Sequence, residues 1–154
     1  MTEFAYLSDR PHAVDEVAAW WFEAWEGWPY ASSEGVAEEL RGELSRDTLP
    51  IQIIALEGGA AIGSAVLKQQ EMRKSFPEFE FWLGNVYVKP EYRGRKLATQ
   101  LALHVESIAL ARGVPQLYLA TEQLDGGLYA KIGYRAVVET RKRDADVLVM
   151  VKRI

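Results

Sequence analysis

The segment best suited to chemistry is a short basic run that follows an apolar stretch. Residues 86–88 alternate as a strand does, Pro90 ends that strand because it has no backbone N–H, and apolar residues recur at helical spacing from Leu97. Between these elements lie Arg93, Gly94, Arg95 and Lys96. The first turn of a helix has unpaired N–H groups and partial positive charge, which stabilise an anionic oxygen. The segment therefore predicts a phosphate-binding turn.

Two common phosphate-binding motifs are absent. No segment reads Gly-x-x-x-x-Gly-Lys-Ser/Thr, and no strand is followed by Gly-x-Gly-x-x-Gly. The sequence therefore supports neither a nucleoside-triphosphate loop nor a dinucleotide-binding fold. Taken alone, the basic turn is more typical of a solvated surface turn than of a ligand site. The remainder of the chain reverses that preference.

A second motif, Leu-Tyr-Ala-Lys-Ile-Gly-Tyr at 128–134, lies roughly 30 residues beyond the basic turn. Together with residues 86–98, an expected helix to Arg112 and an expected strand at 117–120, it resembles the GNAT superfamily of acyl-CoA N-acyltransferases. The resemblance covers the C-terminal two-thirds of the chain. It implies an N-acetyltransferase that moves an acetyl group from acetyl-CoA to a primary amine, of a small molecule or a peptide N-terminus, by direct attack in a ternary complex.

The first motif departs from the family at one position. Arg93 and Ala98 match the ends of the family pattern, but Lys96 stands where the family usually has its second glycine. This changes how closely the backbone approaches the pyrophosphate, although a lysine ammonium can itself contact phosphate. By resemblance, CoA is the product, and the expected cofactor-binding residues are Val86, Tyr87, Val88, Arg93, Gly94, Arg95, Lys96, Leu97, Ala98 and Thr99.

The resemblance also implies catalytic roles. The backbone N–H of Val86 would donate to the thioester oxygen, and one such donor is worth about 3–4 kcal/mol of barrier. The simpler interpretation, that Val86 and Val88 pack in a buried strand, is compatible with this role. Tyr129 matches the general acid of many members, because a phenol with a pKa of about 10 stays protonated and can protonate a departing thiolate. A tyrosine in a short helix is also commonly a core residue, but the following Gly133-Tyr134 favours the catalytic interpretation.

The general base is the least defined part of the predicted site. An amine with a pKa of about 10.4 arrives as ammonium and must lose a proton. Some relatives have a glutamate four residues before the position of Val86, where this chain has Trp82. Glu80 lies two residues earlier and would share that face by strand alternation, so it is the candidate base. Glu122 is another candidate, both are more often surface residues, and a chain of waters would need neither.

The amine pocket is expected between the N-terminal helices and the loop at 69–79. Trp21, Trp25 and Trp28 recur at helical spacing with Trp20 beside them, which is more typical of core packing than of a ligand platform, although one end could wall a pocket. Acidic residues would favour a cationic amine, or would simply form a solvated face. They are Glu23, Glu26, Glu34, Glu38, Glu39 and Glu43.

The elements that position these residues follow from periodicity. Helices are expected at 13–25, 32–46, 97–112 and 128–131, with Ser32 or Ser33 capping the second. Strands are expected at 4–7, 51–56, 60–67, 80–88, 116–120, 134–140 and 147–151. This order matches the α+β fold of the family: one domain over residues 1–154, with a central, mostly antiparallel sheet of six to seven strands and helices on both faces.

Composition excludes several classes of protein. The chain has 154 residues, of which 49% are hydrophobic, enough for one core without covalent staples. It has no cysteine, and no metal site is expected. No apolar run reaches signal-peptide length or the roughly 20 residues that span a membrane, so a cytoplasmic protein is expected. A net charge of −4 argues against nucleic-acid binding, and the basic run at 141–143 is expected to be a solvated hairpin tip.

Two other functions stay open at this point. A non-catalytic module could use the same turn to sense acyl-CoA and report to a partner, although Tyr129 counts against it. An interaction domain would bind neither acetyl-CoA nor CoA. Acetylation of any amine separates the enzyme from the sensor, and the sequence does not decide between a monomer and a homodimer.

Overall fold

Seven strands form one sheet within residues 1–25 and 30–154, the part of the chain that this computed structural model describes. The strands are β1 (Thr2–Tyr6), β2 (Ile51–Glu57), β3 (Ala60–Lys68), β4 (Trp82–Val88), β5 (Gln116–Thr121), β6 (Arg135–Lys142) and β7 (Ala145–Arg153). Their order across the sheet is β1-β2-β3-β4-β5-β7-β6, and all neighbours are antiparallel except β4 and β5. The predicted α+β fold with a mostly antiparallel sheet is confirmed.

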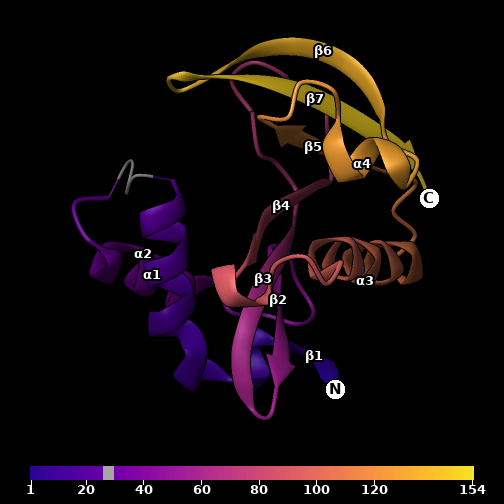
Figure 1. The fold of residues 1–154 in the computed structure, drawn as a ribbon. Coiled ribbons are helices and arrows are strands. Elements are labelled where there is room, and N and C mark those ends of the chain that lie inside the picture. Colours follow the sequence, from indigo (N-terminus) through magenta and orange to yellow (C-terminus); the bar gives the residue numbers. More distant parts are fainter. Residues whose placement is uncertain (26–29) are drawn as a thin grey trace.

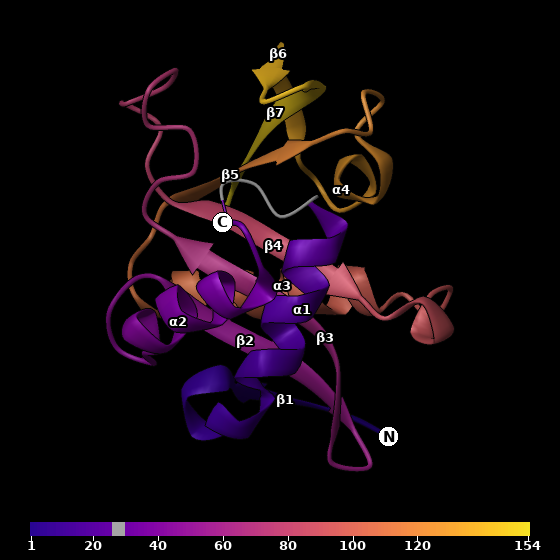
Figure 2. The same cartoon turned by 90° about the vertical axis from the view of Figure 1, so that its left-hand side faces the viewer.

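Helices cover both faces of this sheet, as predicted. Helices α1 and α2 lie on one face, and α3 and α4 lie on the other (Figure 1, Figure 2). Ser32 is the N-cap residue of α2, but its side chain makes no capping hydrogen bond. The α-helices are α1 (Val14–Ala24), α2 (Ser33–Glu43), α3 (Leu97–Ala111) and α4 (Gly127–Lys131), with short 3-10 helices at Leu7–Asp9, Pro11–Ala13 and Pro90–Tyr92.

The two helical layers bury opposite faces of the central strands. In β2, Ile51 and Ile53 pack in the cluster that contains Leu101 of α3, whereas Ile54 packs with α1 and α2. This alternation follows from the two-residue period of a strand. Gly63 of β3 permits a close approach on the α3 side, since a Cβ there would lie 2.8 Å from the Tyr87 carbonyl oxygen and 3.1 Å from Leu101.

Strand β4 begins two residues later than the sequence predicts. Phe81 has a φ of 72°, which breaks the extended backbone before Trp82. Its N–H donates to the Gln69 carbonyl at 3.0 Å, and its own carbonyl accepts from the Tyr118 N–H at 2.9 Å. Glu80 therefore lies in the β3–β4 connection and not in the strand, so the alternation argument that placed it on the Val86 face is wrong.

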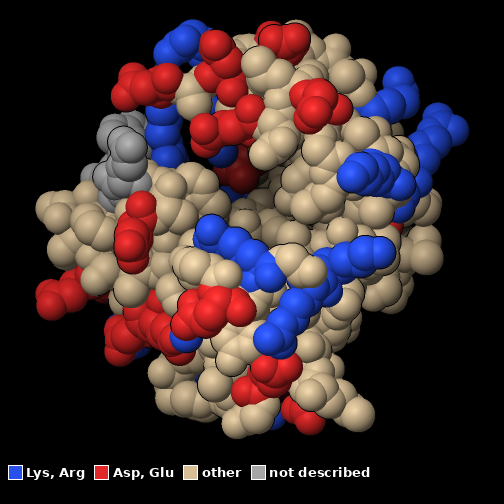
Figure 3. Space-filling view, in the orientation of Figure 1, with Lys and Arg blue, Asp and Glu red and all other residues tan. Residues whose placement is uncertain are grey.

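The sheet opens between β4 and β5. In the described part of the chain these strands pair only at Trp82 and Tyr118, and β5 then continues alongside β7. Trp82 is fully buried, and its indole Nε1 donates to the Phe79 carbonyl at 2.6 Å. In the space-filling view a hollow lies between α1 and α4, on the side where the strands diverge (Figure 3). The divergence leaves β4 without a neighbouring strand on that side.

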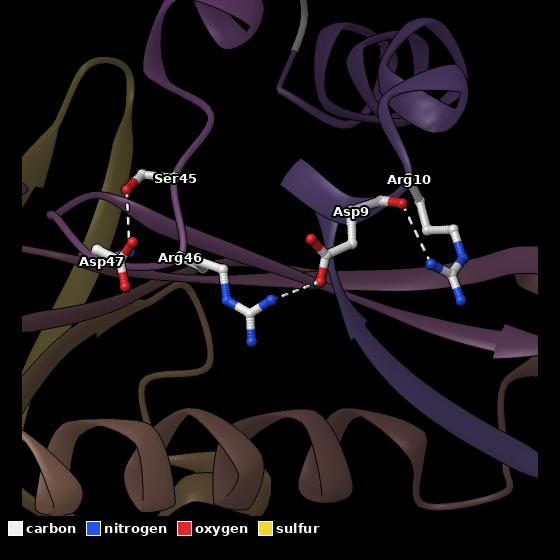
Figure 4. A network of polar contacts seen from close by, with 5 residues as sticks. All are labelled: Asp9, Arg10, Ser45, Arg46 and Asp47. Atoms are coloured by element: carbon white, nitrogen blue, oxygen red, sulfur yellow. Dashed lines mark hydrogen bonds and ion pairs between the residues drawn. The ribbon is translucent and has the colours of Figure 1, made fainter.

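A polar turn fixes the connection from α2 to β2. The Asp47 N–H donates to Ser45 Oγ at 3.0 Å, and Arg46 Nη1 lies 3.2 Å from Asp9 Oδ2 (Figure 4). Arg10 Nη1 donates to the Asp9 carbonyl at 3.1 Å. These groups are exposed, so each adds little stability. Helix α2 ends at Glu43, earlier than the predicted end near residue 46, because Leu44 already has an extended backbone with a ψ of 125°.

Candidate functional site

Two cavities meet where the sheet opens. A narrow groove of about 780 Å³ lies between the end of β4, the start of α3 and α4. A wide cleft of about 1390 Å³ lies between α1, α2, the β3–β4 connection and the β6–β7 hairpin. The two share four lining residues, which are Val86, Thr121, Gln123 and Tyr129. A molecule in the groove and another in the cleft would therefore meet at the predicted catalytic tyrosine.

The narrow groove gathers the predicted cofactor-binding residues, with one exception. Arg95 does not line it: its guanidinium lies 5.1 Å from the centre of the Tyr92 ring and 3.5 Å from Glu57. The lining residues are Val86, Tyr87, Val88, Arg93, Gly94, Lys96, Leu97, Ala98 and Thr99, joined by Thr121, Gln123, Leu128, Tyr129, Lys131 and Ile132.

The turn before α3 is built from left-handed residues and an arginine brace. Gly94 has a φ of 83° and Lys96, the N-cap of α3, a φ of 61°. Arg93 folds back, so that its Nε donates to the Val88 carbonyl at 2.9 Å and its guanidinium lies over the Tyr87 ring. The brace ties the turn to the end of β4. The first N–H groups of the 15-residue helix α3 then border the groove with Lys96.

Lys96 occupies a conformation that favours glycine, so Lys96→Gly should stabilise the protein. A left-handed conformation costs a side-chain-bearing residue about 1–2 kcal/mol, and the extra freedom of glycine in the unfolded chain returns about 0.5–1 kcal/mol of that. We expect the free energy of unfolding to rise by up to about 1 kcal/mol. Urea denaturation measures this free energy. Lys96→Ala is the control, because alanine keeps the Cβ that strains the left-handed backbone and should not raise the free energy of unfolding. A loss of stability for Lys96→Gly would contradict the strain argument.

The β4 backbone is irregular beside the groove. Asn85 has a φ of 51°, and the β3–β4 register shifts between Ser64 and Val66. A hydrogen-bond chain holds this bulge, because Trp21 Nε1 donates to Ser64 Oγ at 2.9 Å and that hydroxyl donates to the Asn85 carbonyl at 2.9 Å. The bulge adjoins Val86, whose N–H is the predicted thioester donor. Bulges of this kind re-aim backbone groups beside active sites.

Tyr129 lies on α4 at the junction of the two cavities. The Gly127 N–H donates to Asp125 Oδ1 at 3.0 Å where α4 begins, and the Tyr129 ring packs edge-on against Tyr134, with centroids 6.0 Å apart. Burial raises the pKa of Tyr129 to about 12. The phenol therefore keeps its proton across the physiological pH range, as a proton donor must.

A pair of charged residues, Glu106 and Lys152, lies beside Tyr134. Lys152 Nζ lies 2.7 Å from Glu106 Oε1 and 5.7 Å from the centre of the Tyr134 ring. Burial, and then the nearby Glu106 carboxylate, raise the pKa of Tyr134. The Tyr134 hydroxyl and Glu106 Oε2 are both buried. This group fixes the end of the α4 segment and so the ring against which Tyr129 packs.

The two candidate bases lie apart. Glu80 is exposed, accepts a hydrogen bond from Gln69 Nε2 at 2.9 Å, and lines neither cavity. Glu122 is also exposed, but it lines the wide cleft.

The tryptophans divide between the core and the cleft. Trp20 is buried and stacks on Tyr87, with ring centroids 5.3 Å apart, as the packing interpretation predicts. Trp21 and Trp25 line the cleft, so that part of the stripe walls a cavity. Trp28, together with Glu26, lies outside the described residues. His104, not needed for the site, stacks on Phe4 at 4.9 Å.

Acidic groups line the α2 side of the cleft. Of the N-terminal glutamates, Glu39 and Glu43 border the cavity. Burial, and then the nearby charge of Glu39, raise the pKa of Glu43, while Lys68 opposes this shift. An added cation would stabilise two neighbouring carboxylates. This wall is therefore suited to an ammonium group.

The cleft also holds a charged cluster that sequence reasoning missed. Glu71 Oε2 lies 3.2 Å from Lys68 Nζ and 3.2 Å from Lys142 Nζ; we refer to these residues as the Lys68–Glu71–Lys142 cluster. The expected hairpin tip is confirmed between β6 and β7, but Lys142 is partly buried instead of solvated. The spacing of Lys68 and Glu71 is a weak local signal for an ion pair, whereas nothing in the sequence indicates Lys142.

Two further findings concern residues 1–25 and 30–154. Within them, no group of three or more histidine, aspartate or glutamate side chains could hold a metal ion. The helices of this same part of the chain are too short or too polar to cross a membrane.

Comparisons with known proteins agree with this geometry. Residues 14–134 match the sequence model of the acetyltransferase (GNAT) family. A comparison with curated protein sequences gives no match. Similar solved structures include an aminoglycoside 6'-N-acetyltransferase complexed with coenzyme A, with a TM-score of 0.76 and 17% identity over 98% of this chain and 96% of that chain.

Two further structures share the fold. An aminoglycoside 6'-acetyltransferase type Ii has a TM-score of 0.75 and 19% identity, covering 98% of this chain and 96% of that one. The PaiA N-acetyltransferase from Thermoplasma acidophilum, in complex with coenzyme A, has a TM-score of 0.64 and 21% identity, covering 100% of this chain and 99% of that one.

Proposed function

The chain belongs to the acetyltransferase (GNAT) family, and on that premise we propose that it transfers an acetyl group from acetyl-CoA to a primary amine by direct attack in a ternary complex. As a family member it is an acyl-CoA-dependent acetyltransferase, with acetyl-CoA as its cofactor. The observation that carries the proposal is the meeting of the groove and the cleft at Val86 and Tyr129.

The narrow groove fits an acyl-CoA. Its turn supplies the α3 N-terminus, the left-handed Gly94 and the Lys96 ammonium, which suit the phosphate groups. The opening beside β4 leaves backbone groups of Val86 and Val88 for an extended arm. Acetyl-CoA supplies the activated acyl group as a thioester.

Two residues of this chain would act on the reacting groups. The Val86 N–H would donate to the carbonyl oxygen as negative charge develops on it. The Tyr129 hydroxyl would give its proton to the departing sulfur. Both residues line groove and cleft, which supports these roles.

The acceptor amine would lie in the wide cleft. Glu39 and Glu43 favour an ammonium by charge, and Trp21 and Trp25 give an apolar wall for the rest of the molecule. We assign removal of the amine proton to Glu122, or to water in front of it, because Glu122 lines the cleft and Glu80 does not.

The size and charge of the cleft support one acceptor class over others. A cavity of about 1390 Å³ exceeds what a simple alkylamine needs. Two of the similar structures are aminoglycoside 6'-acetyltransferases, whose named substrates carry several amines. A multiply charged amine is therefore the first class to screen, followed by amino acids and peptide N-termini.

Binding of acetyl-CoA is the first expected result. Calorimetric titration should show saturable one-site binding of acetyl-CoA and of CoA. At 100 times Kd either ligand should add about 2.7 kcal/mol to the free energy of unfolding, which raises Tm by roughly 5–10 °C for a chain of this size. No heat and no stabilisation with either ligand would contradict the proposal.

Turnover separates the enzyme from the sensor. Release of CoA thiol, followed with a thiol reagent across the amine panel, should be amine-dependent. Saturable acetyl-CoA binding without acetylation of any amine in the panel would instead support the non-catalytic acyl-CoA sensor.

A further inference from the structure

The Lys68–Glu71–Lys142 cluster joins three separate parts of the chain inside the wide cleft. Lys68 ends β3, Glu71 lies in the β3–β4 connection, and Lys142 ends β6. The side chains of Lys68, Glu71 and Lys142 are 24%, 15% and 29% exposed, so the cluster is largely shielded from water. All three residues line the cleft in which we place the acceptor.

Two ammonium groups share the Glu71 carboxylate. Lys68 donates to both Glu71 oxygens, at 3.2 Å each, from only three positions earlier in the chain. Lys142, at the end of β6, has its Nζ 3.2 Å from Glu71 Oε2. The charge of Lys68 also opposes the rise in the pKa of Glu43, a second carboxylate that lines the cleft, so Lys68 alone does not balance both carboxylates and a second ammonium has a place at Glu71. Lys142 supplies this second ammonium from a partly buried position, where it loses part of its hydration.

The charge states agree with this arrangement. Burial alone would raise the pKa of Glu71, but Lys68 and Lys142 together hold it below its usual value, so the carboxylate stays ionised. Burial, and then the charges of Lys68 and Arg143, lower the pKa of Lys142 in spite of its contact with Glu71. Lys142 is therefore less favourably placed as a cation than an ordinary exposed lysine.

Glu71 also reaches the strand that leads to the reacting groups. A Cβ on Gly84 would lie 2.7 Å from Glu71 Oε1 and 3.1 Å from Lys68 Cε, so the ends of both side chains lie against β4 at this position. Gly84 precedes Val86 by two residues on β4. An ammonium bound at Glu71 would thus lie near the strand that carries the proposed thioester donor.

We propose that Lys142 is an internal competitor for the acceptor: its ε-ammonium occupies, on the Glu71 carboxylate, a place that the ammonium of an alkylamine acceptor takes when it binds. The two groups are chemically equivalent, since each is a primary ammonium with three donors. The long, flexible lysine stem lets the side chain leave Glu71 without moving the hairpin. Lys142 thereby sets how tightly the cleft holds primary amines, which deepens the proposed function and rests on it.

The test is calorimetric titration of 1,4-diaminobutane into protein saturated with CoA. We expect Lys142→Met to bind the diamine about tenfold more tightly than wild type, because a cation no longer has to be displaced. Lys142→Arg should bind like wild type, since it restores the charge. Arg141→Met is the matched control: Arg141 is the neighbouring β6 residue, is exposed, and pairs with Asp146 at 3.0 Å.

Lys142→Met should not leave a buried charge without a partner, because Glu71 still pairs with Lys68. Thermal unfolding checks this, and Lys142→Gln serves as a second variant. Equal or weaker diamine binding by Lys142→Met and Lys142→Gln, or no binding to any variant, would overturn the proposal. Failure of acetyl-CoA to bind would instead count against the proposed function, so the two failures are distinguishable.

Discussion

Tyr129→Phe is expected to lower kcat by about 100- to 1000-fold and to leave the Kd for acetyl-CoA within about twofold of wild type. The change removes one hydroxyl and keeps the ring that packs edge-on against Tyr134. General acids contribute about this much to a rate, because the departing thiolate would otherwise have to find a proton in water. The effect therefore belongs to the chemical step and not to binding.

The raised pKa of Tyr129 gives this prediction a pH signature. Burial penalises the charged phenolate and raises the pKa to about 12, so the donor form persists as the pH rises. The kcat of wild type should show no fall from Tyr129 ionisation below about pH 11. Steady-state kinetics and calorimetry measure both parts, with Tyr134→Phe as the control that removes a neighbouring hydroxyl. Unchanged kcat for Tyr129→Phe at every pH would exclude the acid role.

Trp82→Ala should lower the free energy of unfolding by about 3–5 kcal/mol, the usual cost of removing a large buried aromatic. Trp82 is fully buried, packs near the Tyr118 ring with centroids 5.5 Å apart, and lies where β4 and β5 pair. The substitution leaves a cavity and removes the donor to the Phe79 carbonyl. The place where β4 and β5 pair would lose its large buried side chain.

Urea denaturation followed by circular dichroism checks the stability of Trp82→Ala, and Tm should fall by roughly 6–20 °C. Trp25→Ala is the matched control, because Trp25 is only partly buried and borders the cleft. Its expected cost is about 1 kcal/mol or less. Equal losses for the two variants would show that Trp82 has no special place in the core.

The fold follows closely from local sequence patterns. The run at 51–67 predicts a hairpin, and Gly58 and Gly59 have φ values of 58° and 82° as a tight hairpin turn requires. The switch from strand to helix period around Lys96 predicts β4 and α3 with nearly correct bounds. These features depend on neighbouring residues, so a single sequence contains them.

The site is less predictable, because its residues contact partners that lie far away in the sequence. Phe81 takes a φ of 72° under the influence of Gln69 and Tyr118, and no local pattern indicates a positive φ at a phenylalanine. That one residue invalidates the alternation on which Glu80 depends. Lys142 likewise belongs to a basic run that looks solvated, yet its Nζ lies 3.2 Å from Oε2 of Glu71, a residue far away in the sequence.

The opening between β4 and β5 also bears on how the molecule avoids aggregation. A strand without a neighbour normally invites a strand from another chain to pair with it. Here the unpaired stretch of β4 lies in the middle of the sheet, while the outer strands are β1, with five residues, and β6, which carries Arg135, Glu139 and Arg141. Short or charged outer strands discourage association. The protein thus keeps an open line of backbone groups for an extended small molecule inside the sheet, while its two outer strands are short or charged.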